Sequence, residues 1–154
     1  MANLKADMVQ VYVFRGHGRD REYLLLQRDS DDTLYPDLWQ MVTGSIESDE
    51  RATDAARREL QEETGIVAAT EFVVVPYIAS FYLAEDDSVH NVPVFAVEVP
   101  ESTEISLSPE HQCYDWLPYE QAIRRLVFPG HKEGLRILHY AANLKHPNDY
   151  LTTL

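Results

Sequence analysis

Apolar and polar residues alternate along several stretches of the chain, and this period of two predicts β-strands that expose one face and bury the other. Other stretches are rich in valine, isoleucine, phenylalanine and tyrosine, which pleated sheets favour. The predicted strands cover Met8–Phe14, Glu22–Arg28, Leu38–Val42, Glu71–Leu83, Val92–Val99 and Tyr114–Leu117. The first two form a hairpin, because the segment between them carries two glycines.

Three further segments predict helices. The first begins after Ser48 or Asp49, either of which can cap its first turn, and ends where Gly65 supplies a left-handed stop. The other two cover Tyr119–Leu126 and Lys132–Leu144. Strands outnumber helices and do not alternate strictly with them, so we expect an α/β (α+β) fold class with a mixed sheet and helices packed on its faces.

Composition narrows the class of protein. A chain of 154 residues with 45% hydrophobic residues predicts one domain over residues 1–154. The formal charge of −13 excludes a general nucleic-acid binder, which needs an excess of Lys and Arg. No apolar run is long enough to cross a membrane, and the first ten residues do not form a signal peptide. The single cysteine, Cys113, fits a reducing compartment. We therefore expect a cytoplasmic protein, while its oligomeric state stays open.

The first predicted helix carries charges where its buried face should be. At about 100° per residue, Glu59 and Glu63 fall on the same face as Leu60, and Glu62 lies at the edge of that face. Like charges at this spacing repel, and an unpaired buried carboxylate costs several kcal/mol. A divalent cation such as Mg²⁺, which prefers carboxylate oxygens, would compensate, and Arg58 is a second positive partner. A solvated charge run is the alternative, which the small apolar residues of this face disfavour.

These residues belong to a longer pattern. The segment Gly44–Ile66 reads GSIESDERATDAARRELQEETGI and resembles the Nudix box, G-x5-E-x7-R-E-U-x-E-E-x-G-U with U apolar. It matches at every fixed position: Gly44, Glu50, Arg58, Glu59, Leu60, Glu62, Glu63, Gly65 and Ile66. A chance match in a chain of this length has a probability on the order of 10⁻⁷. The resemblance implies a Nudix-type α/β/α sandwich with a mixed central sheet.

The same resemblance implies an activity, which is Mg²⁺- or Mn²⁺-dependent hydrolysis of a nucleoside diphosphate linked to another group. By position, the metal ligands would be Glu62 and Glu63, with Glu59 as a further ligand or the general base. Arg58 would orient these glutamates and Glu50 would support them. The carbonyl region of Gly44 would lie at the edge of the metal site.

Two flanking patterns resemble the dihydroneopterin triphosphate pyrophosphatase branch of the family, which acts in folate biosynthesis. They are W-Q-x-V-T-G-S at 39–45 and E-H-x-x-Y-x-W at 110–116. By this resemblance Glu110 is an extra metal ligand or the base, although it could be a surface glutamate. Trp39 could stack on a ring or belong to the core. Gln40 could contact a ring edge or lie on an outer face, and Arg28 could contact phosphate or face solvent.

We expect a hydrolase whose partner is a small-molecule phosphoanhydride substrate. The best guess is dihydroneopterin triphosphate, cleaved to the monophosphate and pyrophosphate, within the wider class of nucleoside and pterin triphosphates. Dinucleoside polyphosphates and oxidised nucleotides are the enzymatic alternatives. A Nudix-like nucleotide-sensing module without turnover is the non-enzymatic alternative, and the presence of Glu59, Glu62 and Glu63 disfavours it.

Overall fold

A mixed sheet of nine strands forms the centre of the computed structural model, which describes residues 1–67 and 71–154. The strands are β1 (Asn3–Lys5), β2 (Met8–Arg15), β3 (Glu22–Arg28), β4 (Trp39–Gln40), β5 (Val42–Ser45), β6 (Glu71–Leu83), β7 (Ser88–Glu98), β8 (His111–Pro118) and β9 (Thr152–Thr153). Their order is β4-β3-β2-β7-β6-β9, while β1 pairs with β7, β5 with β2 and β8 with β3. The β2–β7 and β1–β7 pairs are parallel and the others antiparallel, which confirms the mixed sheet.

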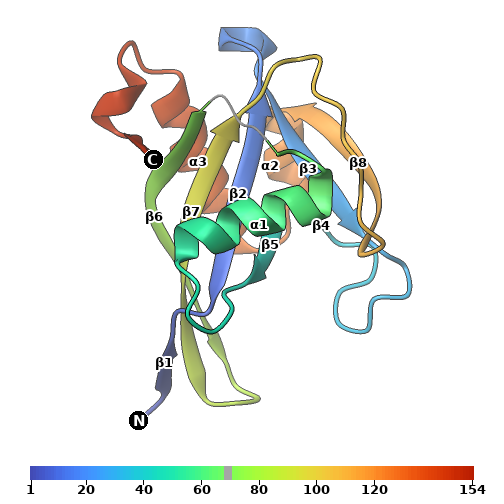
Figure 1. Cartoon of the computed structure of the whole chain (residues 1–154), viewed down its shortest axis with the longest axis vertical. Coiled ribbons are helices and arrows are strands. Elements are labelled where there is room, and N and C mark those ends of the chain that lie inside the picture. Colours follow the sequence, from blue (N-terminus) through green and yellow to red (C-terminus); the bar gives the residue numbers. More distant parts are fainter. Residues whose placement is uncertain (68–70) are drawn as a thin grey trace.

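Helices cover both faces of this sheet (Figure 1). Helix α1 (Ala52–Thr64) crosses one face, and helices α2 (Tyr119–Arg125) and α3 (Pro129–Ala142) lie behind the other. Short 3₁₀ turns lie at 18–20 and 147–149. The arrangement is the expected α/β/α sandwich.

Strict alternation along β2 explains why the sheet has two cores. Val11 and Val13 pack with Leu60 of α1, whereas Tyr12, between them, packs with Leu135 of α3. All five side chains are at most 3% exposed. Because burying one valine or leucine side chain contributes about 1.5–3 kcal/mol, both faces of β2 contribute to holding the helices on the sheet.

The start of α1 differs from the expectation. Arg51 occupies the N-cap position and no side chain caps the helix, so the expected caps, Ser48 and Asp49, are wrong. Asp49 has a positive φ of 65°, and the backbone N–H of Glu50 donates a hydrogen bond to the carbonyl of Glu47. These residues therefore form a tight turn that precedes the helix.

Other boundaries shift less. Gly65 ends α1 with φ 74°, as expected. The single strand expected over Leu38–Val42 is two strands, separated at Met41, because β4 pairs with β3 while β5 pairs with β2. Helix α3 begins at Pro129 and not at Lys132, since proline fits the first turn of a helix. Among the described residues no helix is long and apolar enough to cross a membrane.

Candidate functional site

Arg58 connects the acidic residues of the box through five hydrogen bonds. Its Nε and Nη2 donate to the two carboxylate oxygens of Glu50, both at 2.9 Å. Its Nη1 donates to Glu59 at 2.8 Å and to Glu62 at 3.3 Å, and Nη2 also donates to the Ser45 carbonyl at 2.8 Å. The guanidinium lowers the pKa of Glu50 to about 2. Paired in this way, Arg58 holds two glutamates of α1 against the loop that precedes the helix.

Glu59 packs directly on the backbone of Gly44 in β5. Its side chain is 13% exposed, and burial raises the pKa of its carboxyl. A Cβ atom on Gly44 would lie 1.9 Å from Cδ of Glu59. The first glycine of the box is therefore required by close approach of a side chain, not by an unusual backbone angle.

Glu63 is the most deeply buried acid of the site, at 3% exposure. Its carboxylate accepts a hydrogen bond from the backbone N–H of Thr43, while Oε2 has no hydrogen-bond partner among the described residues. Burial, followed by repulsion from Glu110 and Glu59, raises its pKa to about 9. A buried acid surrounded by other acids is a typical position for a bound cation.

Glu110, whose side chain is exposed, approaches Glu63 from the loop before β8, although the two residues are 47 positions apart in the sequence. One oxygen of each carboxylate and one ring nitrogen of His111 lie within 4.8 Å of one another. Within the part of the chain that the structure describes, Glu59 and Glu62 do not belong to this group, and both are paired with Arg58.

His111 is a site residue that the sequence did not reveal. It is 5% exposed, and burial lowers its pKa to about 4. The pairing of β3 with β8 shifts register: Gln27 lies opposite Cys113, whereas Arg28 lies opposite His111. Gln112 is therefore an extra residue, a β-bulge, which turns His111 to the face of the sheet that α1 covers. No local pattern in the sequence predicts that bulge.

Two of the three expected substrate residues lie beside the carboxylates. Arg28 forms an ion pair with Asp32. Its charge adds to the effect of burial in lowering the pKa of His111, and it opposes part of the rise that burial causes in the pKa of Glu63. Gln40 is 4% exposed, so it is not on an outer face, and its amide nitrogen lies 3.3 Å from Nε2 of His111.

Trp39 lies elsewhere. It is opposite Gln27 in the β3–β4 pair and packs against the core that α2 and α3 cover. The guanidinium of Arg125 in α2 stacks over its ring at 4.6 Å. Because successive residues of a strand face opposite sides, Trp39 is on the face away from α1, and the structure does not bring it together with Glu63.

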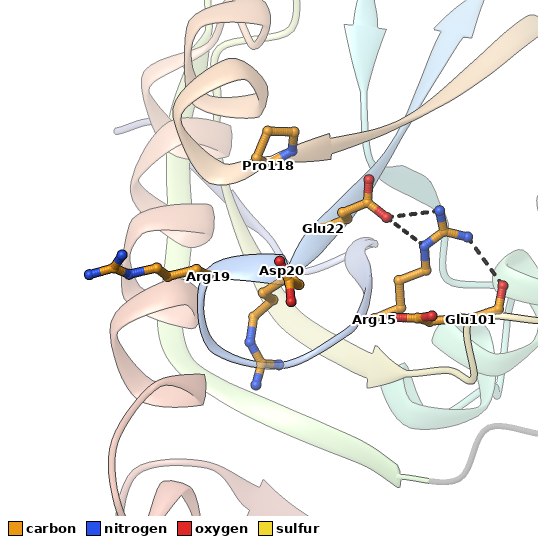
Figure 2. A pocket seen from close by; sticks show the side chains of 7 residues that line it. Arg15, Arg19, Asp20, Glu22, Glu101 and Pro118 are labelled. Carbon is orange, nitrogen blue, oxygen red and sulfur yellow. Dashed lines mark hydrogen bonds and ion pairs between the residues drawn. The ribbon is translucent and has the colours of Figure 1, made fainter.

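A separate hollow of about 430 Å³ lies at the β2–β3 hairpin (Figure 2). Figure 2 shows Arg15 donating to the Glu22 carboxylate and to the Glu101 carbonyl within it. Glu22 and Arg28 are at opposite ends of β3, six residues or roughly 20 Å apart. The hollow therefore is not part of the carboxylate site.

Comparisons with known proteins extend this description. A family model described as NUDIX domain matches residues 5–139. A protein of Myxococcus xanthus named octanoyltransferase is 33% identical over 130 residues, which are 83% of this chain but only 35% of that protein. The mouse bis(5'-nucleosyl)-tetraphosphatase (asymmetrical) is 31% identical over 75% of this chain and 76% of that protein. The dihydroneopterin triphosphate diphosphatase of Escherichia coli K12 is 32% identical over 63% of this chain and 69% of that protein.

Solved structures agree on the fold. The crystal structure of a C. elegans Ap4A hydrolase binary complex superposes with a TM-score of 0.73 at 21% identity, covering 88% of this chain and 96% of that one. The box motif, the sandwich around it and the family match over residues 5–139 all point to one conclusion. The chain belongs to the Nudix hydrolase family.

Proposed function

We propose that this protein is a divalent-metal-dependent pyrophosphohydrolase that cleaves a nucleoside or pterin triphosphate to the monophosphate and pyrophosphate. One observation carries the proposal: the buried, unpartnered Oε2 of Glu63 lies in a group of carboxylates to which Glu110 also belongs. A phosphoanhydride substrate is polyanionic, and the chain has a formal charge of −13. A cation between protein and substrate would remove this repulsion.

The residues of the site fit such a cation. Nudix hydrolases generally use divalent metals, and the donors here are mainly carboxylate oxygens, which suit Mg²⁺ and Mn²⁺. Glu63 and Glu110 would hold the cation, with Glu59, Glu62 and the carbonyl region of Gly44 on the adjoining side. When bound, the metal would neutralise phosphate charge and position water.

The other residues would orient groups and move protons. Arg58 keeps Glu59 against Gly44, so that this carboxylate has a single position relative to the substrate. Glu59 or Glu110 would accept the proton of the attacking water, a step that needs a carboxylate within hydrogen-bond reach. Arg28, beside Glu63, would contact a phosphate oxygen once it exchanges its partner Asp32.

Dihydroneopterin triphosphate is our first candidate substrate. It is supported by the two sequence patterns that contain Trp39 and Glu110, and by similarity to the E. coli diphosphatase named for it. Recognition of a ring edge by Gln40 is part of this proposal, whereas stacking by Trp39 is not, because its ring packs on the opposite face of the sheet. The second candidate is a dinucleoside tetraphosphate. It is supported by similarity to the mouse bis(5'-nucleosyl)-tetraphosphatase, which is 31% identical to this chain over 76% of its own length.

The test is product analysis with Mg²⁺ on four substrate types: dihydroneopterin triphosphate, the common nucleoside triphosphates, an oxidised guanine nucleotide and diadenosine tetraphosphate. Glu62→Gln should lower turnover by orders of magnitude while the protein stays folded. Asp54→Asn removes a carboxylate from the exposed side of the same helix and is the matched control.

Fast pyrophosphate release from the pterin alone supports the first candidate, and preferred cleavage of diadenosine tetraphosphate supports the second. Full activity of Glu62→Gln refutes the proposed site. If none of the substrates is hydrolysed but one binds, the nucleotide-sensing alternative replaces the enzymatic proposal.

A further inference from the structure

His111, beside the carboxylate site, has a buried ring nitrogen, Nδ1, without a hydrogen-bond partner among the described residues. The residue as a whole is 5% exposed. Oε2 of Glu63 is buried and unpartnered in the same way. A buried polar atom without a partner costs about 1–3 kcal/mol, so two of them in one group require an explanation.

The spacing of these groups fits a shared cation. One ring nitrogen of His111 and one oxygen each of Glu63 and Glu110 lie within 4.8 Å of one another. Ligands about 2.0–2.2 Å from a metal are separated by up to roughly 4.4 Å, so only small side-chain movements are needed. Neither Nδ1 of His111 nor Oε2 of Glu63 is accessible to solvent, so bulk water does not supply the missing partner of either atom.

We propose that His111 ligates the divalent metal together with Glu63 and Glu110, so that the site has one nitrogen and two oxygen donors on the protein. The inference rests on the proposed metal-dependent function. It goes beyond it by adding a ligand outside the box and by stating which metals the site prefers.

Gln40 would set the orientation of this ligand. Its side-chain amide lies against Nε2 of His111, with 3.3 Å between the two nitrogens. Since amide oxygen and nitrogen are interchangeable by rotation, the oxygen of Gln40 can accept a hydrogen bond from Nε2–H. That bond leaves the lone pair of Nδ1 free for the metal, as in other metal sites where a partner fixes the histidine tautomer. Gln40 is therefore a positioning residue in this proposal.

A mixed donor set changes the metal preference. Imidazole binds Mn²⁺ and Co²⁺ better than Mg²⁺, which retains water and oxygen ligands. His111 should therefore raise the affinity for Mn²⁺ relative to Mg²⁺. Loss of the imidazole should lower Mn²⁺ affinity by about tenfold or more and change Mg²⁺ affinity much less.

The experiment is pulsed electron paramagnetic resonance on the full chain, free of any histidine tag and loaded with Mn²⁺ alone. A directly bound imidazole gives ¹⁴N modulation of the Mn²⁺ signal. We expect this modulation in the wild type, its loss in His111→Gln, and its retention in His131→Gln. His131 is the matched control because it is a second buried histidine with an unpartnered Nδ1, on the face away from α1.

Dissociation constants for Mn²⁺ and Mg²⁺, measured by titration calorimetry on the same three proteins, complete the test. Mn²⁺ bound to the wild type without ¹⁴N modulation overturns the inference and leaves the proposed metal-dependent function intact. Absence of Mn²⁺ and Mg²⁺ binding to the wild type overturns both. A wild-type spectrum without ¹⁴N modulation overturns the inference even if His111→Gln does not fold.

Discussion

Replacing Gly44 by alanine tests whether the position of Glu59 controls the chemistry. The added Cβ would lie 1.9 Å from Cδ, 2.2 Å from Oε1 and 2.4 Å from Cγ of Glu59. Ordinary contact begins at about 3.4 Å, so the carboxyl group must move by about 1.5 Å. A displacement of that size breaks the 2.8 Å bond from Arg58 to Glu59.

The expected effect is on catalysis rather than on folding. A misplacement of 1 Å at a reacting group costs about 100-fold in rate, so kcat/KM of Gly44→Ala should fall by about that factor. The displaced carboxylate can reach solvent, and the midpoint of thermal unfolding should therefore shift by only a few degrees. The assay is phosphoanhydride hydrolysis with the best substrate of the four types, beside a thermal melt.

Two controls separate this mechanism from a general cost of the substitution. Gly130→Ala introduces the same methyl group in α3, where the nearest atom is Cβ of Ala79 at an ordinary 3.4 Å, and should keep full activity. In a Glu59→Gln background, Gly44→Ala should cost little more, because both changes act on one group. A Gly44→Ala enzyme within threefold of wild type, or a fully additive double variant, would refute the reasoning.

Three further outcomes follow from the contacts of single residues. Arg58→Lys loses the forked pairing with the two carboxylate oxygens of Glu50 and should lower kcat/KM by about 10–100-fold. Arg57→Lys, on the exposed side of α1, is the control and should retain activity. Equal kinetics of the two variants would contradict this prediction. In scanning calorimetry, millimolar Mg²⁺ should raise the free energy of unfolding of the wild type by about 1 kcal/mol and leave that of Glu63→Gln unchanged. Equal increases in the two proteins would show that Glu63 is not part of the metal site. Burial lowers the pKa of His131 to about 4, so the unfolded state binds more protons and stability should fall as pH drops from about 6.5 to 4. Denaturant titrations should show that the wild type loses about 3 kcal/mol more stability over that range than His131→Gln, in which this ionisation is absent. Parallel pH profiles of both proteins would refute the assignment.

Much of the site could be predicted because α1 repeats a simple period. The 3.6-residue repeat predicts that Leu60 and Glu63 are buried and that Arg57 is exposed, and all three predictions are confirmed. The fixed positions of the box identify Arg58 as the partner of the glutamates, which the hydrogen bonds confirm. These features depend only on residues within one or two turns of each other.

The helix start and the strand at 38–42 were predicted less well. Ser48 and Asp49 have the right chemistry for a helix cap. They lie in the tight turn at 47–50, however, and the N-cap position of α1 is Arg51, so neither side chain caps the helix. Strands β4 and β5 are separate because β4 pairs with β3 and β5 pairs with β2. The local composition of residues 38–42 does not predict these two different partners. The expectations of one domain over 1–154 and of a cytoplasmic location stay predictions.

The sequence by itself determined the family, the buried face of α1, its stop at Gly65 and the acids that face one another, because these follow from local periodicity and from the box. Only the tertiary structure decided that Glu110 meets Glu63 across 47 positions and that His111 joins them. The physical reason is strand register. One extra residue, Gln112, reverses which side of β8 its neighbours face, and that choice depends on pairing with β3 rather than on any residue nearby in the chain.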